Sequence, residues 1–250
     1  MSEKPRMYSG FHAVSSILRH RPEAVLELFV RDRRAERGDP RLEVLCEQAR
    51  QAGVSVQSAR DRVLERHAGA GHQGVVARAR PRRPGDEQAL FAHLDGLDRP
   101  PMLLVLDGIM DPHNLGACLR SADAAGVDAV ILPRRHACGL TPVACRVAVG
   151  AAESLVCFEV GNLPGVLARL RERAVCVLGS ARDPAAVSVH KLLPGESGTA
   201  VVMGAEDQGI RAAVRKNCDR LVEIPMAGEV ESLNVSVATG IVLYKLLTGR

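Results

Sequence analysis

Short apolar runs alternate with amphipathic stretches along the whole chain. Among the first 80 residues, the segments 25–30 and 54–56 predict strands, while 41–53 and 59–66 place apolar residues at helical spacing. A glycine-rich stretch at 67–77 leads into a further strand. This alternation predicts a small α/β unit in the first part of the chain.

The second part opens with an apolar run at 102–106, which has no polar alternation and is typical of a parallel strand buried on both faces. A helix is expected over 114–125, and Gly126 ends it before a strand at 127–132. The apolar face of that helix consists of Leu115, Cys118, Leu119 and Ala122. This unit predicts a right-handed α/β layer. Later strands are expected at 174–178, 200–203 and 221–224, and helices near 143–152, 163–173 and 211–218.

The last strand stops at Pro225, which cannot donate a ladder hydrogen bond. A loop with Gly228 follows, and a helix is expected to open near Ser232, whose hydroxyl can cap it. The apolar residues at helical spacing are Leu233, Val237, Ile241 and Tyr244. Taken alone, this pattern predicts a buried C-terminal helix with a serine cap.

A basic, proline-broken stretch at 78–84 is typical of a linker, with phosphate contact as an additional possible role. A short helix is expected over 86–97. The chain is therefore predicted to have an N-terminal domain at 1–80, a linker at 81–98 and a second domain at 99–250.

The composition, with 46% hydrophobic and 25% charged residues, is that of an ordinary globular protein. No apolar run approaches a membrane span and the N-terminus has no apolar signal core, so we expect a cytoplasmic protein with no membrane partner. The seven cysteines form no Cys-x-x-Cys pair, and the eight histidines show no ligand spacing. Reduced thiols and no metal site are therefore expected.

Charge differs between the two parts of the chain. Residues 1–99 hold 18 Lys and Arg against 14 Asp and Glu, whereas the remainder holds 15 of each. The net charge of +4 therefore lies in the first part, almost entirely as arginine, whose fork suits phosphate oxygens. With four Phe, two Tyr and no Trp, a base-stacking platform for single strands is not expected.

Three glycine-containing stretches follow the apolar strands of the second part: DGIMDPHNLGACLRSA at 107–122, VVMGAEDQGI at 201–210 and IPMAGEVESLNVSVATG at 224–240. In order, spacing and residue identity they resemble the three motifs of the SpoU (TrmH-type) RNA ribose 2'-O-methyltransferases of the SPOUT superfamily. The resemblance covers nearly the whole chain. The segments 10–14 and 72–77 are similar to the L30e-like substrate-binding domain of those members that methylate a guanosine of 23S ribosomal RNA.

The resemblance implies an α/β protein in which a small L30e-like domain precedes a SPOUT domain, a parallel sheet with a C-terminal trefoil knot. It implies methyl transfer from S-adenosylmethionine (AdoMet) to a ribose 2'-hydroxyl of a guanosine in 23S rRNA. It also implies a homodimer, because the knotted domains of the family pair to complete their sites. No GxGxxG follows a predicted strand, which disfavours a dinucleotide site.

Strand ends are where α/β folds place ligands. By the resemblance, the cofactor-binding residues are Gly204, Ile224, Met226 and Leu233, which contact the adenine and ribose largely through backbone groups. A tight turn after a strand would also favour glycine at position 204, so a purely structural role for Gly204 is the alternative.

The catalytic residues implied by the motifs are Arg120, Asn114, Glu206, Ser232 and Asn234. Arg120 lies off the apolar face of its helix, where a solvated arginine is usual, but the motif places it beside the target phosphate and 2'-hydroxyl. Because a guanidinium stays protonated, we expect it to lower the pKa of the hydroxyl, with the proton leaving to phosphate or water. Asn114 is either a helix N-cap or a ribose contact.

One position departs from the family pattern. Asp207 stands where a glycine usually follows the motif glutamate, Glu206. Aspartate tolerates a positive φ better than most residues, so the loop is expected to persist with some strain. The added negative charge is expected to weaken RNA binding.

Other functions remain open from the sequence. A tRNA ribose methyltransferase of the same family is disfavoured by the full N-terminal domain. A non-catalytic RNA-binding assembly factor is disfavoured by the intact motif residues, and a small-molecule AdoMet enzyme by the arginine-biased first part.

Overall fold

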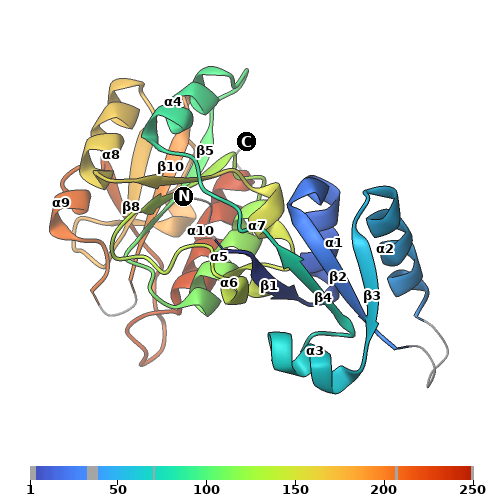
Figure 1. The fold of residues 1–250 in the computed structure, drawn as a ribbon. Coiled ribbons are helices and arrows are strands. Elements are labelled where there is room, and N and C mark those ends of the chain that lie inside the picture. Colours follow the sequence, from blue (N-terminus) through green and yellow to red (C-terminus); the bar gives the residue numbers. More distant parts are fainter. Residues whose placement is uncertain (1–3, 33–38, 70, 206–207, 249–250) are drawn as a thin grey trace. The chain divides into compact units, whose positions relative to one another are not determined.

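The computed structural model describes residues 4–32, 39–69, 71–205 and 208–248 and divides the chain into two compact units (Figure 1). Unit 1 comprises Met1–Arg83 together with Leu140–Ser154. Unit 2 comprises Pro84–Gly139 and Leu155–Arg250. Each unit is built around its own sheet. None of the described helices is long and apolar enough to cross a membrane.

Unit 1 contains a four-stranded mixed sheet in the order β1-β4-β2-β3. Strand β4 pairs antiparallel with β1 and β2, while β2 and β3 are parallel. The strands are β1 (Arg6–Ser9), β2 (Val25–Arg31), β3 (Ser55–Ala59) and β4 (Val75–Ala79), and the helices α1 (Phe11–His20), η1 (Pro22–Ala24), α2 (Pro40–Gln51) and α3 (Asp61–Ala68). The predicted small α/β unit is therefore present. The short strand β1 was not predicted. The similarity of this unit to the L30e fold stays a prediction.

The segment predicted as a linker at 78–84 begins inside the sheet, since β4 contains Arg78 and Ala79. The Arg78 guanidinium pairs with Glu27 on β2 at 2.6 Å. Arg82 donates to the carbonyl oxygens of Ala152 and Glu153 at 2.8 and 2.5 Å. These contacts could not be predicted, because the linker was inferred from its prolines and arginines alone. Such a composition does not show which distant residues the arginines contact. Residues 78–79 are thus part of the fold rather than a solvated connector.

Unit 1 also holds a segment distant in sequence, with helices α6 (Pro142–Val147) and α7 (Ala151–Ser154). Glu153 is nearly buried, with 3% of its side chain exposed, and accepts hydrogen bonds from Arg21 Nε at 2.6 Å and Nη2 at 3.0 Å. Ser16 Oγ donates to the Gly150 carbonyl at 2.9 Å. The charged pair therefore fastens this segment to α1 inside one unit.

Removal of the Glu153 carboxylate is expected to destabilise unit 1. In Glu153→Ala the partly buried guanidinium of Arg21, whose side chain is 20% exposed, loses its partner. Removing one member of a buried pair costs about 3–5 kcal/mol, and the partial exposure of Arg21 places the expected cost at the lower end of that range. Urea unfolding measures the change. Glu47→Ala, on the exposed face of α2 and paired with Arg50, is the matched control and should leave the midpoint unchanged. Equal midpoints for both variants would contradict the structural role of Glu153.

Unit 2 contains a seven-stranded sheet in the order β7-β6-β5-β10-β8-β11-β9, in which every neighbouring pair is parallel. The strands are β5 (Met102–Asp107), β6 (Ala129–Pro133), β7 (Cys157–Val160), β8 (Cys176–Ser180), β9 (Val187–Ser188), β10 (Thr199–Gly204) and β11 (Arg220–Glu223). The predicted parallel sheet is confirmed, whereas β7 and β9 were not predicted. The trefoil knot stays a prediction.

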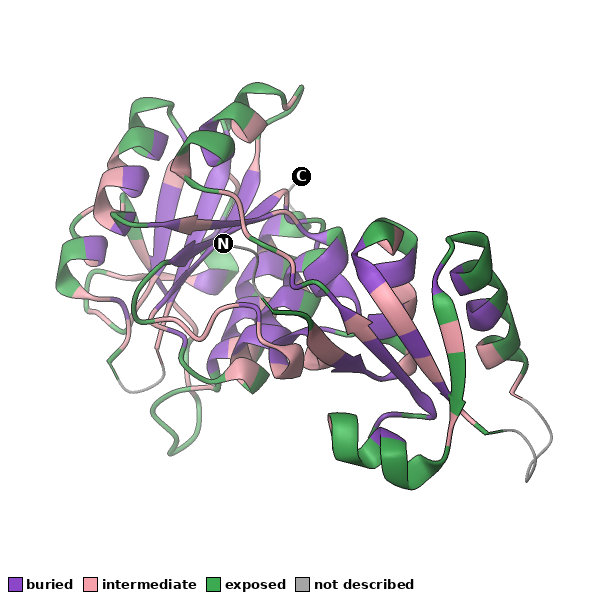
Figure 2. Cartoon of the chain, in the orientation of Figure 1, coloured by how far each residue is buried: buried purple, intermediate pink, exposed green. Residues whose placement is uncertain are grey.

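Helices cover both sides of this sheet: α4 (Glu87–Asp95) and α8 (Leu163–Glu172) lie on one side, and α5 (Pro112–Ala124) and α10 (Val235–Leu247) on the other (Figure 1). The other helices of unit 2 among the described residues are η3 (Val189–Lys191) and α9 (Ala212–Arg215). Every residue of β5 is buried, as its unbroken apolar run predicted, and Figure 2 shows the central strands buried along almost their whole length. The apolar face predicted for α5 is also buried.

The structure assigns both helix caps to residues other than Ser232, the predicted cap of the last helix, and Asn114, for which capping was one of two alternatives. The N-cap of α5 is Asp111, whose carboxylate accepts from the His113 N–H at 2.9 Å, so Asn114 lies inside the helix and caps nothing. The N-cap of α10 is Asn234, which accepts from the Ser236 N–H at 3.0 Å, and Ser232 lies before the helix. In both cases the backbone places a different Asx residue at the N-cap position, where its side-chain oxygen can accept from the first turn.

The apolar stripe predicted for the C-terminal helix is not its buried face. Val237, Ile241 and Tyr244 are 51%, 37% and 48% exposed. The buried residues of α10 are instead Val235, Ala238, Thr239, Val242, Leu243 and Leu246. The helix is apolar nearly all round, so periodicity could not identify the side that packs on the sheet.

Cys218 packs against β8, where a Cβ added at Gly179 would lie 2.7 Å from the Cys218 sulfur. Burial raises the pKa of this thiol to about 11, and Asp219 adds to the shift. All seven cysteines are free thiols, and no cluster of potential metal ligands occurs among the described residues.

Cys218 is therefore expected to react slowly with iodoacetamide at pH 8. A raised pKa keeps the thiol protonated, so at pH 8 its thiolate fraction is about two hundredfold below that of a cysteine with the ordinary pKa of about 8.5. The rate should rise about tenfold per pH unit until the pKa is reached. Peptide-resolved mass spectrometry of alkylated protein measures this, and modification at the rate of an unfolded-chain cysteine at pH 8 would contradict it.

Candidate functional site

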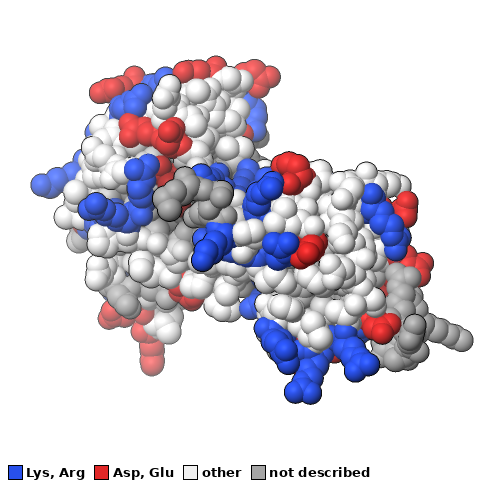
Figure 3. Space-filling view, in the orientation of Figure 1, with Lys and Arg blue, Asp and Glu red and all other residues white. Residues whose placement is uncertain are grey.

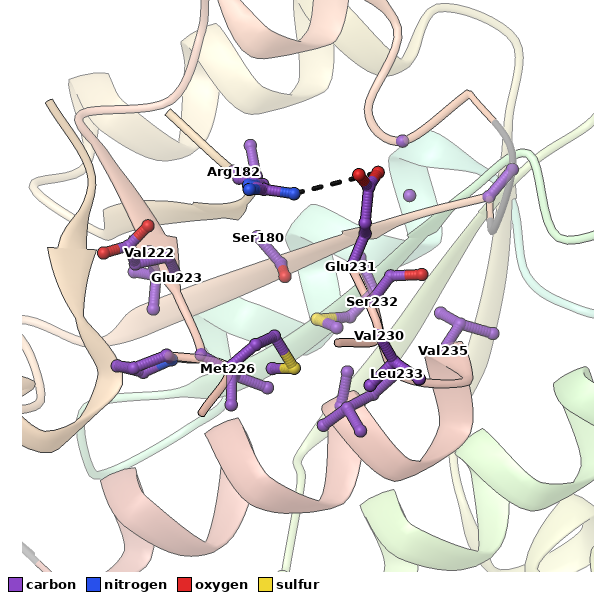
Figure 4. Close-up of a pocket in the computed structure, with 18 of the residues that line it drawn as sticks. Ser180, Arg182, Val222, Glu223, Met226, Val230, Glu231, Ser232, Leu233 and Val235 are labelled. Carbon is purple, nitrogen blue, oxygen red and sulfur yellow. Dashed lines mark ion pairs between the residues drawn. The ribbon is translucent and has the colours of Figure 1, made fainter. Parts of the chain in front are cut away.

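A cavity of about 620 Å³ opens at the carboxyl ends of β8, β10 and β11 (Figure 4). Three loops build it, one after each of these strands, and the last continues into α10. Its lining includes all four predicted cofactor residues and one predicted catalytic residue: Gly204, Ile224, Met226, Leu233 and Ser232. The tertiary structure thus brings these five residues together, although they span 30 positions of the sequence.

Gly204 is required here by a close approach of two backbone segments. It ends β10 opposite Asp107 of β5, and the chain then turns back so that the Gly209 N–H donates to the Ala205 carbonyl at 2.8 Å. A Cβ at position 204 would lie 2.1 Å from the Gly209 carbonyl carbon and 2.3 Å from the Ile210 nitrogen. Only glycine fits at this point of the cavity wall, because any side chain would overlap with the backbone of Gly209 and Ile210.

The charged side chains around this cavity are mostly acidic. The described lining residues include three glutamates, Glu223, Glu229 and Glu231, and one arginine, Arg182, so their net charge is negative. Arg182 and Glu231 approach each other to 3.8 Å across the opening, as the dashed line in Figure 4 shows. Both side chains are largely exposed, so this pair adds little stability, and the two side chains can separate at low cost. A cationic ligand suits such a lining.

A second cavity, of about 560 Å³, adjoins the first and shares Ala205, Gly209 and Val235 with it. The loop after β5 and the start of α5 form most of its wall. The other lining residues are Asp107, Gly108, Ile109, Met110, Asp111, Asn114, His136, Gln208 and Arg211.

Asn114 and Asn234 are joined directly, although 120 positions separate them. The Asn234 amide donates to the Asn114 carbonyl oxygen at 2.8 Å, while its own oxygen accepts from the Ser236 N–H and hydroxyl. The side chain of Asn234 therefore has two roles: its oxygen caps α10, and its NH₂ group orients the side chain of Asn114. Two motif segments are thereby fixed to each other beside the cavities.

Arg120 lines neither cavity. It lies six residues beyond Asn114 on α5, about 9 Å along the helix axis and about 120° around it. Its side chain is exposed, and within the described residues no hydrogen bond or ion pair holds it. Glu206 and Asp207, including the predicted effect of Asp207 on RNA binding, lie outside the described residues.

Comparison with known proteins identifies the family. Residues 101–244 match the SpoU rRNA Methylase family, and residues 9–85 match the family of RNA 2'-O ribose methyltransferase substrate-binding domains. The chain belongs to the SpoU rRNA methylase family. The predicted resemblance is confirmed over both units of the SpoU chain.

Two curated SpoU relatives match over nearly their full length. The 23S rRNA (guanosine-2'-O-)-methyltransferase RlmB of Photobacterium profundum is 44% identical, covering 98% of each chain. The RlmB of Bordetella pertussis is 46% identical, also covering 98% of each chain. Among solved structures, the AdoMet complex of the SpoU methyltransferase AviRb from Streptomyces viridochromogenes has the same fold, with a TM-score of 0.76, 23% identity and coverage of 97% of this chain and 89% of AviRb.

Sequence reasoning missed several residues of the two cavities in this SpoU chain. Ser180 ends β8 and Arg182 follows it, so the strand-end rule applied there would have found them. The contact between Asp107 and Arg211 carried no sequence signal, because it joins positions 104 apart.

Proposed function

We propose that this SpoU protein transfers a methyl group from AdoMet to the ribose 2'-hydroxyl of a guanosine in 23S rRNA. The observation that carries the proposal is the meeting of the predicted cofactor residues in one strand-end cavity, next to a second cavity that contains Asn114. The relatives at 44% and 46% identity bear the name of this reaction.

The first cavity fits AdoMet, which supplies an electrophilic methyl group on a sulfonium when bound. Its wall at Leu233, Met203 and Val222 is apolar and suits the adenine ring. The carboxylates of Glu223 and Glu231 suit a cofactor that carries sulfonium and ammonium charges. The side chains of Gly204, Ile224 and Met226 carry no charged group. The backbone N–H and C=O groups of these residues are therefore proposed to bind the adenine and ribose.

The catalytic residues of the proposal are Arg120, Asn114, Glu206, Ser232 and Asn234. Asn114 orients the target ribose, and Asn234 holds Asn114 through the 2.8 Å hydrogen bond. Ser232 lines the first cavity and is proposed to act there beside the cofactor. Arg120 stabilises the developing oxyanion of the 2'-hydroxyl, whose proton leaves to phosphate or water. Glu206 is proposed to position Arg120 or the last motif.

The N-terminal domain, proposed at 1–80, binds the RNA, and residues 81–98 connect it to the methyltransferase domain at 99–250. Arg60, Arg62 and Arg66 are exposed at and along α3 and form no ion pair among the described residues. Figure 3 shows basic side chains gathered over this part of unit 1. Unpaired arginines on one helix suit phosphate oxygens.

A homodimer would complete the site. Val237, Ile241 and Tyr244 fall on one face of α10 at helical spacing and remain exposed in a single chain. Arg120 lines neither cavity of its own chain, and a dimer offers it a partner's cavity. Both observations support the homodimer that the resemblance implied. Because the proposed substrate is ribosomal RNA, the proposal places the protein in the cytoplasm.

Ile241→Glu is expected to convert the dimer into monomers. A charge in the centre of an apolar interface is left desolvated and unpaired, which costs more than a marginal interface provides. Analytical ultracentrifugation measures the mass. Val44→Glu, at a 59% exposed position on α2, is the matched control and should remain dimeric. Monomeric wild-type protein at micromolar concentration would contradict the proposal.

Nucleoside mass mapping tests the reaction itself. Unmodified 23S rRNA is incubated with the protein and AdoMet, digested and examined for new methylated nucleosides. A single new 2'-O-methylguanosine is expected. Product on tRNA alone would favour the tRNA branch of the family. Methylation of neither RNA, with AdoMet binding intact, would favour a non-catalytic RNA-binding factor.

A further inference from the structure

The second cavity contains a charged pair that the proposed roles leave unused. Asp107, at the end of β5, is fully buried, and its carboxylate is bound by a residue 104 positions away. Arg211 donates to Asp107 Oδ1 from Nε at 2.8 Å and from Nη2 at 2.6 Å. The backbone N–H of Arg211 donates to Oδ2 at 3.0 Å. Three contacts therefore fix both the chain and the guanidinium of Arg211.

This arrangement leaves one edge of the guanidinium available. Arginine carries five N–H donors in a rigid planar fork. The edge formed by Nε and Nη2 is directed at Asp107, so the edge formed by Nη1 and Nη2 retains parallel donors. No described residue accepts a hydrogen bond from Nη1. Because the side chain of Arg211 is 39% exposed and lines the cavity, this free edge is accessible to a ligand.

The charges around the cavity favour a neutral ligand over a phosphate. The Arg211 charge is balanced by Asp107, and Asp111 adds a further carboxylate at the wall. One oxygen of Asp111 accepts from the His113 N–H, while the other has no partner among the described residues. Among the described lining residues, two carboxylates and one guanidinium leave a net negative charge, which disfavours an anion. The lining presents donors and an acceptor to an uncharged polar group.

We propose that Arg211 reads the target base of the methylation reaction by donating to O6 and N7 of guanine, and that the buried Asp107 holds it in place to do so. This inference rests on the proposed function. Guanine presents these two acceptors side by side, and a bidentate arginine is the commonest contact that recognises them. Adenine carries an amino donor where guanine has O6, so its donor would oppose the donors of Arg211.

The position of the cavity agrees with this role. It shares Ala205, Gly209 and Val235 with the proposed AdoMet cavity, so a base bound there lies next to the methyl donor. Asn114, the proposed ribose contact, lines the same cavity. Ile109 and the exposed Met110 add apolar surface for the face of a base. The carboxylate of Asp111 is an acceptor for the N1 and N2 donors of guanine.

Atomic substitution in the RNA tests the proposal. A short RNA contains the nucleotide that mass mapping identifies, either as guanosine or as 7-deazaguanosine, in which a C–H replaces N7. The kcat/KM of methyl transfer is measured for wild type, for Arg211→Lys and for Arg171→Lys. Arg171 is the matched control, since its Nε donates to Asp219 at 2.6 Å and it lines neither cavity. Calorimetry with AdoMet verifies that all three proteins bind the cofactor.

Wild type and Arg171→Lys are expected to lose about tenfold in kcat/KM on the 7-deaza RNA. Arg211→Lys keeps the charge but loses the fork, so it should lose about tenfold or more on guanosine and nothing further on 7-deazaguanosine. Its AdoMet affinity should stay within about twofold of wild type, because Arg211 lies outside the first cavity.

Two outcomes would overturn the inference. One is methylation of both RNAs by wild type within twofold, which decides the matter even if Arg211→Lys fails to fold. The other is an Arg211→Lys protein that still prefers guanosine tenfold. If wild type fails to methylate the guanosine RNA at all, the proposed function itself is overturned, and this inference falls with it.

Discussion

Gly204→Ala is expected to abolish AdoMet binding and to lower the melting temperature of the protein by about 6–12 °C, as follows from a cost of about 3 kcal/mol. The added methyl would lie 2.1 Å from the backbone of Gly209, and backbone atoms cannot move aside as a flexible side chain can. The strand end and the returning turn must separate, which distorts the wall that both cavities share. Differential scanning calorimetry and AdoMet titration measure the two effects.

Gly161→Ala is the matched control. Its added Cβ meets nothing within 4 Å, so its stability and AdoMet affinity should equal those of wild type. A Gly204→Ala protein with the wild-type melting temperature would show that the turn accommodates a side chain. In that case, the requirement for glycine at position 204 would not be steric.

Arg120→Ala is expected to reduce kcat by about 10²–10³-fold, the usual effect of removing one donor that stabilises a developing oxyanion. Its stability and AdoMet affinity should be unchanged, because the side chain is exposed and lines neither cavity. Single-turnover methyl transfer with saturating AdoMet measures the rate. Arg120→Lys should recover part of the loss, since it keeps the charge but not the planar fork.

Arg220→Ala serves as the control for loss of an exposed arginine. Arg220 begins β11, at the opposite end of the strand from the cavity, and its replacement should leave kcat unchanged. A wild-type rate for Arg120→Ala would show that Arg120 takes no part in the reaction. An equal loss in both variants would indicate a general effect of charge on RNA binding.

Most elements of unit 2 could be predicted because their signals are local. The unbroken apolar run of β5 predicted a buried parallel strand, and the apolar face of α5 predicted its packing side. Elements with weaker signals were missed. Strand β9 has only two residues, and β1 and β7 have four each, which gives little pattern to distinguish. Strand β11 is equally short, but Pro225 marks its end and made it recognisable.

Some residues of the candidate site could likewise be predicted from local signals, whereas others could not. Gly204, Ile224, Met226 and Leu233 follow the ends of apolar strands, and parallel strands bring their carboxyl ends to one edge, so their meeting in one cavity could be anticipated. The N-caps could not be assigned from the sequence, because Asp111, Asn114, Ser232 and Asn234 are all suitable capping residues and only backbone geometry selects among them.

Local sequence patterns predicted the order of most strands and helices, the parallel sheet and the three loops that carry the family motifs. Which residues meet depended on the tertiary fold. It joined Asp107 to Arg211 and Asn234 to Asn114, and it placed Leu140–Ser154 within unit 1. It also exposed one face of α10. Periodicity reports which residues prefer burial within one element, whereas contacts between distant positions depend on how whole elements pack, which no local pattern contains.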